Sequence, residues 1–368
     1  MNRARILLYP LSVVYRVVIA VRNTLFDGGI LKSKKFPIWV ISVGNLSVGG
    51  TGKSPHIEYL LRLLGKLPEY KNLKFSPEHT AILSRGYGRN TSGFLEVTEN
   101  STAQEVGDEP MQMRWKFKDV HIAVDENRVK GINKLLEINK DINLVLLDDA
   151  FQHRYVKSSL SILLTNFHRP FYEDSMMPTG TLREPKGGYR RADIIIVTRT
   201  PYDLLDVEKK MIVKKINPYP HQKVFFSSVI YQDMTPVYDA ALIGKKITKD
   251  TTVVLLTGIA NANDFRKHIQ KVAKEVIHIN YPDHHWYSLV EIMKMIDIFN
   301  NIQSEDKIIL TTEKDAARLH QASITEHLEK LPVFYTPIQV KVKDEEAFQA
   351  EIIRQLGSYQ LYKPIQRV

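Results

Sequence analysis

A glycine-rich segment followed by lysine and serine could bind a polyphosphate. Residues 44–55 read Gly-Asn-Leu-Ser-Val-Gly-Gly-Thr-Gly-Lys-Ser-Pro. In such a loop, backbone N–H groups turn toward phosphate oxygens, and the following helix start adds its positive dipole end. We expect Lys53 to reach the β- and γ-phosphates and Ser54 to ligate Mg²⁺. The cradle itself would comprise Gly49, Gly50, Thr51 and Gly52. The strict pattern has glycine where this chain has Ser47, and a glycine-rich turn without a ligand is the alternative.

Two acidic residues after an apolar run could serve the same chemistry. The run Asn143–Leu147 is followed directly by Asp148 and Asp149. A buried strand that ends in acidic residues holds Mg²⁺ in many nucleotide-binding proteins, directly or through water. A capping aspartate at a strand exit is the alternative. Together with the lysine and serine of the glycine-rich segment, the pair favours a site for ATP and Mg²⁺.

Asp108 is a candidate for the group that acts on an acceptor hydroxyl. A phosphoryl-transfer enzyme needs a carboxylate that orients or deprotonates its acceptor. Asp108 also precedes a predicted helix at Pro110–Phe117, so helix capping is the alternative role. His284 and His285 follow Tyr-Pro-Asp in the C-terminal part. Adjacent side chains on an extended segment diverge, which favours assistance to a carboxylate over zinc binding.

Four arginines could bind an anionic acceptor. Arg85 and Arg89 bound an Arg-Gly-Tyr-Gly-Arg turn, and Arg154 follows the acidic pair within Phe-Gln-His-Arg. Arg183 lies in a long irregular stretch, His168–Arg191, that is rich in proline, glycine and arginine. Long loops in compact domains are often functional. For each arginine, a solvated surface or a packing role is the alternative.

These residues require a framework, and the pattern of apolar runs predicts an α/β fold. Strands are expected at Trp39–Val43, His79–Ser84, Val120–Val124, Asn143–Leu147, Leu160–Leu164 and Ile194–Thr198. Helices are expected at Pro55–Leu67, Pro110–Phe117 and Arg128–Asn139. Continuous Val/Ile/Leu runs separated by helices indicate a mostly parallel sheet covered on both faces. Such sheets bind ligands at the carboxyl ends of their strands.

A chain of 368 residues is long enough for two domains. We expect an N-terminal basic amphipathic region at 1–35, a P-loop core at 36–222, a β-ribbon linker at 223–240 and a smaller C-terminal α/β domain at 241–368. That domain should contain strands Thr252–Thr257 and Lys307–Thr311, and its last helix, Glu345–Leu356, can pack back on the core with Asp344 as its cap. Because the chain has no cysteine, disulfides and thiolate metal sites are excluded.

The N-terminal region is basic, which points to an anionic partner. The chain has a formal net charge of +10. Residues 1–40 hold seven basic residues against Asp27, a net +6. The basic residues are Arg3, Arg5, Arg16, Arg22, Lys32, Lys34 and Lys35. Nucleic acid, an acidic membrane surface and a phosphorylated substrate are the candidate partners.

The apolar content of this region favours a membrane surface. Ile6–Val21 is largely aliphatic but falls short of the roughly 20 residues that span a bilayer. After Pro10, one predicted helical face carries Val13, Val14, Val17, Val18 and Val21. The other face carries Ser12, Arg16 and Asn23. This pattern favours a helix that lies in an anionic interface. A signal peptide and a helix packed on the protein's own core are the alternatives, and a nucleic-acid-binding arm would need more lysine and fewer valines.

The motifs described so far, with three others, occur in an order that resembles one family, the tetraacyldisaccharide 4′-kinases of lipid A synthesis. The matching segments are 44–55, Ser-Arg-Gly-Tyr-Gly-Arg at 84–89, Gly-Asp-Glu-Pro at 107–110, Asp-Asp-Ala-Phe-Gln-His-Arg at 148–154, Leu-Arg-Glu-Pro at 182–185, Pro-Asp-His-His at 282–285 and Thr-Glu-Lys-Asp at 312–315. The resemblance extends from about residue 5 to about residue 340. That family uses a longer Gly-Asn-x₃-Gly-Gly loop, so Ser47 is no departure from it.

The resemblance implies transfer of the γ-phosphoryl of ATP to the 4′-hydroxyl of a tetraacylated glucosamine disaccharide 1-phosphate, which forms lipid IVA in lipid A (lipopolysaccharide) biosynthesis. By that likeness, the residues that bind ATP and Mg²⁺ are Lys53, Ser54, Asp148 and Asp149. Asp108 would act as the base on the 4′-hydroxyl with His284 as its partner, and His285 is the fallback. The likeness also implies a P-loop core, a β-ribbon and a smaller C-terminal domain that close to exclude water.

The implied partners are a membrane glycolipid and the anionic inner-membrane surface, at the cytoplasmic face, with no nucleic acid. A soluble small-molecule kinase and a P-loop switch or assembly ATPase are the rival functions. The segment Thr-Thr-Glu-Lys-Asp at 311–315 does not match the Asn-Lys-x-Asp element of guanine recognition, which argues against a GTPase.

Overall fold

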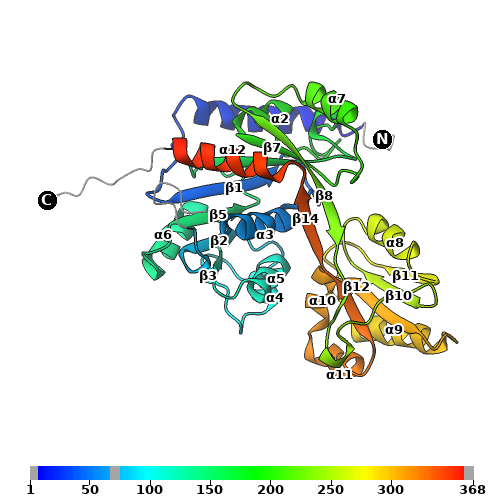
Figure 1. The fold of residues 1–368 in the computed structure, drawn as a ribbon. Coiled ribbons are helices and arrows are strands. Elements are labelled where there is room, and N and C mark those ends of the chain that lie inside the picture. The colour runs from blue at the N-terminus through cyan, green and yellow to red at the C-terminus, as the bar shows by residue number, and fades with distance from the viewer. Residues whose placement is uncertain (1–6, 67–74, 360–368) are drawn as a thin grey trace. The chain divides into compact units, whose positions relative to one another are not determined.

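The computed structural model describes residues 7–66 and 75–359 of the chain. Expectations that concern Arg3, Arg5, Ile6 and Leu67 lie outside these residues. Internal contacts divide the chain into two compact units (Figure 1). The first unit comprises the residues up to Val106, Met113–Val229 and the residues from Val340, and the second comprises Gly107–Gln112 and Ile230–Gln339.

The first unit is built on a nine-stranded, mostly parallel sheet. In spatial order its strands are β14 (Ile338–Val342), β8 (Lys223–Tyr231), β7 (Ile194–Thr198), β6 (Leu160–Asn166), β1 (Trp39–Asn45), β5 (Leu144–Asp148), β2 (Thr80–Ser84), β4 (His121–Val124) and β3 (Leu95–Glu96). The pairs from β8 across to β4 are parallel, and the edge pair of β3 and β4 is antiparallel. Every residue of β1, β2, β5 and β7 is buried, which confirms a sheet that is covered on both faces.

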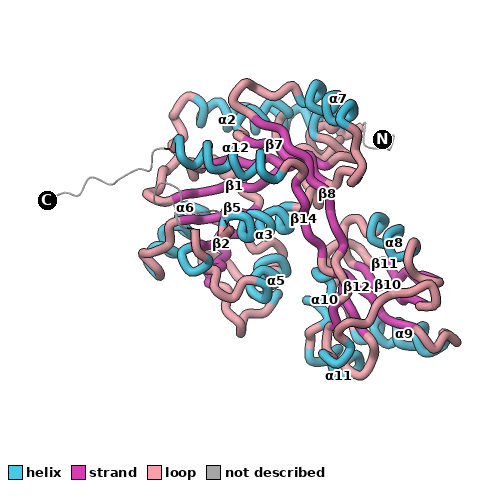
Figure 2. Tube along the Cα trace, viewed as in Figure 1, coloured by secondary structure: helices cyan, strands magenta, loops and turns pink. Residues whose placement is uncertain are grey.

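Helices cover this sheet, as Figure 2 shows. The helices of this unit are α2 (Tyr9–Asp27), α3 (Lys53–Leu64), α4 (Ala103–Val106), most of α5 (Asp108–Lys116), α6 (Arg128–Ile138), α7 (Asp206–Ile216) and α12 (Glu345–Ser358). Asp344 is at the N-cap position of α12, as expected, but it is left-handed with φ 57° and its side chain makes no capping hydrogen bond. The irregular stretch between β6 and β7 contains only two short 3-10 turns, η2 (Phe171–Glu173) and η3 (Lys186–Arg191).

The second unit has a smaller sheet of the same kind. Its strands are, in spatial order, β11 (Glu275–Asn280), β10 (Thr252–Thr257), β12 (Lys307–Thr312), β13 (Val333–Thr336) and β9 (Thr235–Pro236). Its helices are α8 (Asn263–Gln270), α9 (Leu289–Asn301), α10 (Glu313–Leu319) and α11 (Ala322–Leu328). Alternate residues of β10 enter two separate apolar cores, one with Val254 and Leu256 and the other with Val253 and Leu255.

The chain passes from the first unit to the second along β8 and returns along β14, which are neighbours in the large sheet. The strand that joins β8 on its outer side therefore comes from residues 338–342 rather than from the rest of the expected ribbon at 223–240. The first turn of α5 is also counted with the second unit. Among the helices formed by residues 7–66 and 75–359, none combines the length and the apolar content needed to cross a membrane.

Candidate active site

The glycine-rich loop connects β1 to α3. It contains the expected cradle residues, and α3 begins at Lys53 with Ser54 buried in its first turn. Gly49 and Gly52 have φ values of 108° and 86°, a backbone conformation that favours glycine. β1 lies beside β5, with Val43 opposite Asp148. The loop and the acidic pair therefore leave neighbouring parallel strands at the same edge of the sheet, as the sequence predicted.

Asp149 lies between two cations at this edge. The Nζ of Lys53 is 3.8 Å from Oδ2 of Asp149. Arg183 donates from Nη1 to Oδ2 at 3.0 Å and from Nη2 to Oδ1 at 2.6 Å. Burial alone would raise the pKa of Asp149, but the charge of Lys53 and the hydrogen bonds and charge of Arg183 hold it below its ordinary value. The carboxylate is therefore ionised and fixed in orientation.

Arg183 was expected to bind the acceptor, and the structure places it beside Asp149 at the edge of the sheet where β1 and β5 end. Besides Asp149, it donates to the side-chain oxygen of Asn45, the last residue of β1. Asn45 is fully buried and donates in turn to Oγ1 of Thr51 at 2.8 Å. A single chain of hydrogen bonds thus joins the acidic pair, the end of β1 and the glycine-rich loop.

His56 and Arg199 adjoin the same loop, and no sequence pattern predicted either position. The Nδ1 of His56 is 2.6 Å from the carbonyl oxygen of Gly52, and its Nε2 is 2.9 Å from Oγ of Ser227. Burial lowers the pKa of His56 to about 4, with a further decrease from the charge of Arg199. A Cβ atom on Gly50 would lie 3.8 Å from Nη2 of Arg199. The guanidinium therefore stands beside the loop, where it adds positive charge.

The polar face of α2 contacts the segments that carry Arg183 and Gln152, and its predicted apolar face does not. The hydroxyl of Tyr15 donates to the carbonyl of Arg183 at 3.0 Å, and Arg22 donates to the carbonyl of Gln152 at 3.3 Å. Ser12 is buried, with Oγ 2.6 Å from Oγ1 of Thr179. The residues of the predicted apolar face are all exposed: Val13, Val14, Val17, Val18 and Val21. Arg16, which was assigned to the polar face, is exposed as well. Packing on the protein's own core therefore applies to the polar side alone.

The other three arginines that were expected to bind the acceptor share no contact partner. Arg154 donates to the carbonyl of Asn23 at 2.9 Å and to Asp27 at 2.6 Å, so it ties α2 to the core. Arg89 has a buried side chain that donates to the carbonyl of Gly93 and to Glu126. Arg85 is exposed at the carboxyl end of β2. Only Arg85 thus presents its side chain to solvent.

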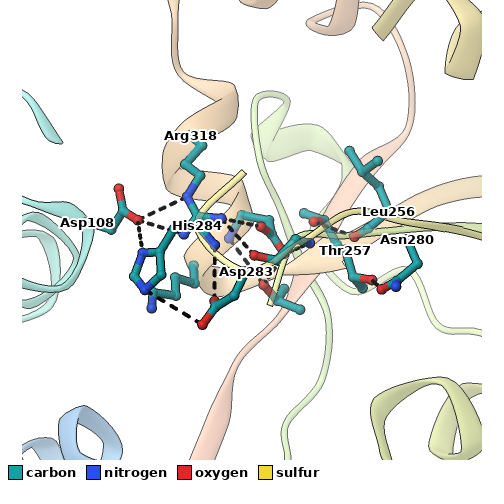
Figure 3. Close-up of polar contacts among 12 residues, drawn as sticks. Asp108, Leu256, Thr257, Asn280, Asp283, His284 and Arg318 are labelled. Atoms are coloured by element: carbon teal, nitrogen blue, oxygen red, sulfur yellow. Dashed lines mark hydrogen bonds and ion pairs between the residues drawn. The ribbon is translucent and has the colours of Figure 1, made fainter. Parts of the chain in front are cut away.

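Asp108 is the first residue of α5 and the centre of a second polar cluster, which lies in the second unit (Figure 3). Its Oδ2 accepts hydrogen bonds from Nε and Nη2 of Arg318, at 3.1 and 2.6 Å, and Nδ1 of His284 lies 3.2 Å away. Burial alone would raise the pKa of Asp108. The hydrogen bond from His284 and the charge of Arg318 lower it below the ordinary value, with a smaller contribution from Lys314. Asp108 is therefore an ionised carboxylate.

The structure distinguishes the two adjacent histidines. His284 points to Asp108 and has a left-handed backbone with φ 60°. His285 instead places Nε2 3.1 Å from each carboxylate oxygen of Glu291 and stacks on the ring of Tyr281 at 4.4 Å between centroids. His284 is thus the histidine that contacts the carboxylate of Asp108, whereas His285 contacts Glu291.

Arg318 is the residue of this cluster that the sequence analysis missed. Its side chain is 0% exposed, and Nη1 donates to Asp315 at 2.9 Å and to the carbonyl of Gly258 at 3.0 Å. Asp315 and Arg318 are three residues apart on α10, so they share one helix face. An arginine on the buried side of a short helix, three residues after an aspartate, is the signal that could have identified it.

Three residues at the loop could supply oxygen ligands to a metal ion. Ser54, Asp148 and Asp149 offer a hydroxyl and two carboxylates, the hard donors that Mg²⁺ prefers. Within residues 7–66 and 75–359, there is no group of three or more histidine, aspartate or glutamate side chains arranged to hold a metal. The donor set therefore fits an ion that takes its remaining ligands from phosphate and water, as Mg²⁺ does with a bound nucleotide.

Comparisons with known proteins agree on one family. The family model described as "Tetraacyldisaccharide-1-P 4'-kinase" matches residues 4–357. A Tetraacyldisaccharide 4'-kinase of Bacteroides thetaiotaomicron is 42% identical over 359 residues, which cover 94% of this chain and 92% of that protein. The protein of the same name from Flavobacterium psychrophilum is 41% identical, with coverage of 97% and 98%.

A solved structure gives the same result for the fold. The crystal structure of LpxK from Aquifex aeolicus, described as an "apo" form in complex with ATP, superimposes with a TM-score of 0.71. The two sequences are 31% identical, and the match covers 96% of this chain and 99% of that one. The likeness therefore extends over both units.

Proposed function

Because this chain belongs to the tetraacyldisaccharide-1-P 4'-kinase family, we propose that it transfers the γ-phosphoryl of ATP to the 4′-hydroxyl of a tetraacylated glucosamine disaccharide 1-phosphate in lipid A biosynthesis. The observation that carries this proposal is the meeting of Lys53 and Asp149, 3.8 Å apart, where the glycine-rich loop and the acidic strand end lie side by side. Lysine and aspartate in this arrangement serve phosphoryl transfer in nucleotide-binding proteins.

The loop side of the reaction is electrostatic. The backbone N–H groups of the loop and the ammonium of Lys53 bind the β- and γ-phosphates and offset the charge that spreads over the transferring group. Ser54, Asp148 and Asp149 would hold Mg²⁺, which would neutralise charge on the phosphate oxygens. Arg183 keeps the carboxylate of Asp149 oriented for that task through its paired hydrogen bonds.

The acceptor side depends on Asp108. Its carboxylate accepts the hydrogen bond of the 4′-hydroxyl, orients the oxygen for attack and takes the proton as the bond to phosphorus forms. Its lowered pKa suits this role, because in a loose transition state the hydroxyl keeps its proton until late and orientation matters more than basicity. His284 contacts Oδ2 of the same carboxylate.

We propose that exposed Arg85 contacts an anionic group of the acceptor. Arg89, Arg154 and Arg183 then serve acceptor binding indirectly, since their guanidinium groups hold Glu126, Asp27 and Asp149 respectively. This division follows the contacts of each side chain: an arginine bound to a carboxylate has fewer donors left for a ligand.

We also propose that α2 docks the enzyme on the anionic inner-membrane surface, from the cytoplasmic face, and that nucleic acid is no partner. Val14 and Val18, 61% and 59% exposed, lie on the apolar side, and the basic Arg16 adjoins them. A helix with this pattern lies in the interface with its apolar face among the acyl chains. A lipid-anchored acceptor would then be delivered at the same surface.

One assay tests the activity. Purified protein is incubated with γ-labelled ATP, Mg²⁺ and a tetraacylated disaccharide 1-phosphate, and the label is followed into lipid and into free phosphate. We expect label in the lipid with the wild-type protein and none with Lys53→Ala, because the phosphates lose their cation. Lys66→Ala, which changes an exposed lysine just after α3, is the matched control and should transfer normally. Label that appears only in free phosphate identifies an ATPase and overturns the proposal.

A further inference from the structure

The two oxygens of Asp108 are not equivalent. Oδ2 receives both nitrogens of Arg318 and lies within hydrogen-bond distance of His284. Among the residues that the structure describes, no hydrogen bond reaches Oδ1. A carboxylate oxygen with three donors has no room for another, whereas Oδ1 retains both lone pairs. The cluster thus selects one oxygen of Asp108 for any further donor.

Arg318 is itself held rigidly. Asp315 receives a hydrogen bond from Nη1 of Arg318 on one oxygen, and on the other it accepts from Oγ1 of Thr312 at 2.7 Å and from the N–H of Gly258 at 3.0 Å. The carbonyl of Gly258 also accepts from Nη1. The planar guanidinium is therefore fixed on both edges, and a flexible ammonium could not reproduce its paired donors.

Stability alone is a poor reason for this arrangement. Arg318 and Asp315 are both fully buried, and the desolvation of buried charges offsets most of their attraction. A buried guanidinium that fixes the direction of the neighbouring carboxylate of Asp108 has a clearer use at a reacting centre, where orientation governs the rate.

We propose that Arg318 is a positioning residue for phosphoryl transfer: it occupies Oδ2 of Asp108 and so dedicates Oδ1 to the acceptor hydroxyl. The inference rests on the proposed kinase function. In the step, the oxygen of the 4′-hydroxyl forms a bond to the γ-phosphorus, and the bond from that phosphorus to the β,γ-bridging oxygen breaks with its electron pair going to ADP. The hydroxyl proton passes to Oδ1 of Asp108. Arg318 touches none of the reacting atoms and acts through Asp108 alone.

The charged groups around Asp108 determine how pH reports on this role. Arg318, His284 and Lys314 all lower the pKa of its carboxyl, and Lys314 is itself paired with Glu109 at 3.0 Å. Removal of the guanidinium removes one of these effects, so the pKa of Asp108 rises. As the pH falls, the carboxylate of Asp108 is then protonated at a higher pH than in the wild type. The acid limb of the rate profile therefore moves to higher pH.

The test uses the full chain with Arg318→Met, Arg318→Lys, Asp108→Asn and the double variant Asp108→Asn/Arg318→Met. The kcat, the KM for each substrate and the pH dependence of lipid phosphorylation are measured. For Arg318→Met we expect kcat to fall about 100-fold or more, within the range of lost general-base assistance, with the KM for ATP changed less than about twofold and the acid limb moved upward. Arg318→Lys keeps the charge, so its acid limb stays near that of the wild type while kcat falls.

The double variant separates positioning from a general effect on the fold. If Arg318 acts through Asp108, the double variant is no slower than Asp108→Asn alone. A further loss of fivefold or more, or an Arg318→Met variant with wild-type kcat and pH profile, overturns the inference. Should Arg318→Met fail to fold, the same comparison is made with Arg318→Lys in both backgrounds. Arg354→Met, which removes an exposed arginine that pairs with Glu351 in the first unit, is the matched control and keeps wild-type kinetics.

The outcome for the wild-type protein keeps the two proposals apart. Absence of lipid phosphorylation by the wild type overturns the proposed function, whatever the variants do. Normal phosphorylation by both wild type and Arg318→Met leaves the kinase in place and removes Arg318 from its mechanism.

Discussion

Arg183 donates hydrogen bonds to both carboxylate oxygens of Asp149, at 3.0 and 2.6 Å, and the Nζ of Lys53 lies 3.8 Å from one of them. The loop that carries Arg183 lies more than thirty residues further along the chain than the acidic strand end. A paired guanidinium contact is directional as well as strong, so it determines which way the carboxylate faces. The long irregular stretch before β7 therefore orients a carboxylate beside the glycine-rich loop.

The contact between Arg183 and Asp149 gives a first prediction. Arg183→Met should lower kcat/KM for ATP by about 10- to 100-fold and raise the Mg²⁺ concentration needed for half-maximal rate, as for other residues that orient a metal ligand. Steady-state kinetics with varied Mg²⁺ measure both effects. Arg190→Met, which breaks an exposed pair with Asp27 in the same stretch, should leave them unchanged. An Arg183→Met enzyme with normal Mg²⁺ dependence contradicts the role.

Asp108 gives a second prediction. Asp108→Asn keeps the size of the side chain and removes the base, so nucleotide binding should remain near normal while transfer falls by about 10²- to 10⁴-fold. Nucleotide affinity is measured by calorimetry and transfer by lipid labelling. Asp119→Asn, at an exposed position after α5, is the control. Full activity of Asp108→Asn would exclude the carboxylate from the reaction.

The exposed face of α2 gives a third prediction. Val14→Gln/Val18→Gln should reduce turnover on acceptor in anionic vesicles at least tenfold, because burial of each valine contributes about 1.5 kcal/mol or more. Turnover on detergent-dispersed acceptor should stay near the wild-type value. The control is Val207→Gln/Met211→Gln, which alters exposed apolar residues of α7. Equal losses on vesicles and in detergent would argue against a docking role.

Substitution is a sharper test here than deletion. The polar side of α2 reaches the carbonyls of Arg183 and Gln152, so removal of the helix would also disturb the segments beside Asp149. The valine variants leave those contacts intact. A loss of activity on vesicles alone then reports on the membrane and not on the site.

His56 gives a fourth prediction, about stability and pH. Burial holds its pKa at about 4 in the folded protein, against about 6.5 when unfolded. In this range of pH, His56 binds a proton in the unfolded chain but not in the folded chain. The free energy of unfolding therefore falls as the pH drops from about 6.5 toward 4. Between pH 7 and pH 5 the effect of this residue on the free energy of unfolding is about 2 kcal/mol.

Urea unfolding of wild type and His56→Gln at these two pH values measures the difference. The variant should lose about 2 kcal/mol less than the wild type on acidification. His153, whose pKa burial also lowers to about 4, adds a similar slope that both proteins share. The exposed His168→Gln is the control, with a wild-type slope. Identical slopes for wild type and His56→Gln would contradict the neutral buried state.

The sequence predicted the sheet and the meeting of the glycine-rich loop with the acidic strand end, because both depend on local patterns. Apolar runs locate buried strands directly, and a glycine-rich loop before Lys53 has its geometry encoded in consecutive residues. Asp148 and Asp149 follow from the same logic, since parallel strands bring their carboxyl ends to one edge. The choice between His284 and His285 did not follow, because it depends on backbone dihedrals that neighbouring residues do not reveal.

Contacts between segments that are distant in the chain could not be predicted from the sequence. Arg318 meets Asp108 across 210 positions, and nothing in either local pattern names the other. Arg183 looked like an anion-binding residue because a charged loop gives no sign of its partner. The β-ribbon was expected within residues 223–240, but the strand that joins β8 on its outer side comes from residues 338–342, because topology and not proximity in the chain determines which strands are neighbours.

The position of β14 and α12 has a consequence for how the protein is made. These elements complete the sheet and helix layer of the first unit, yet they follow every strand of the second unit in the chain. During synthesis, the ribosome must release the whole of residues 230–339 before the edge of the large sheet can close. The sheet of the first unit therefore remains incomplete, with β8 as a temporary edge strand, while the later part of the chain emerges and folds.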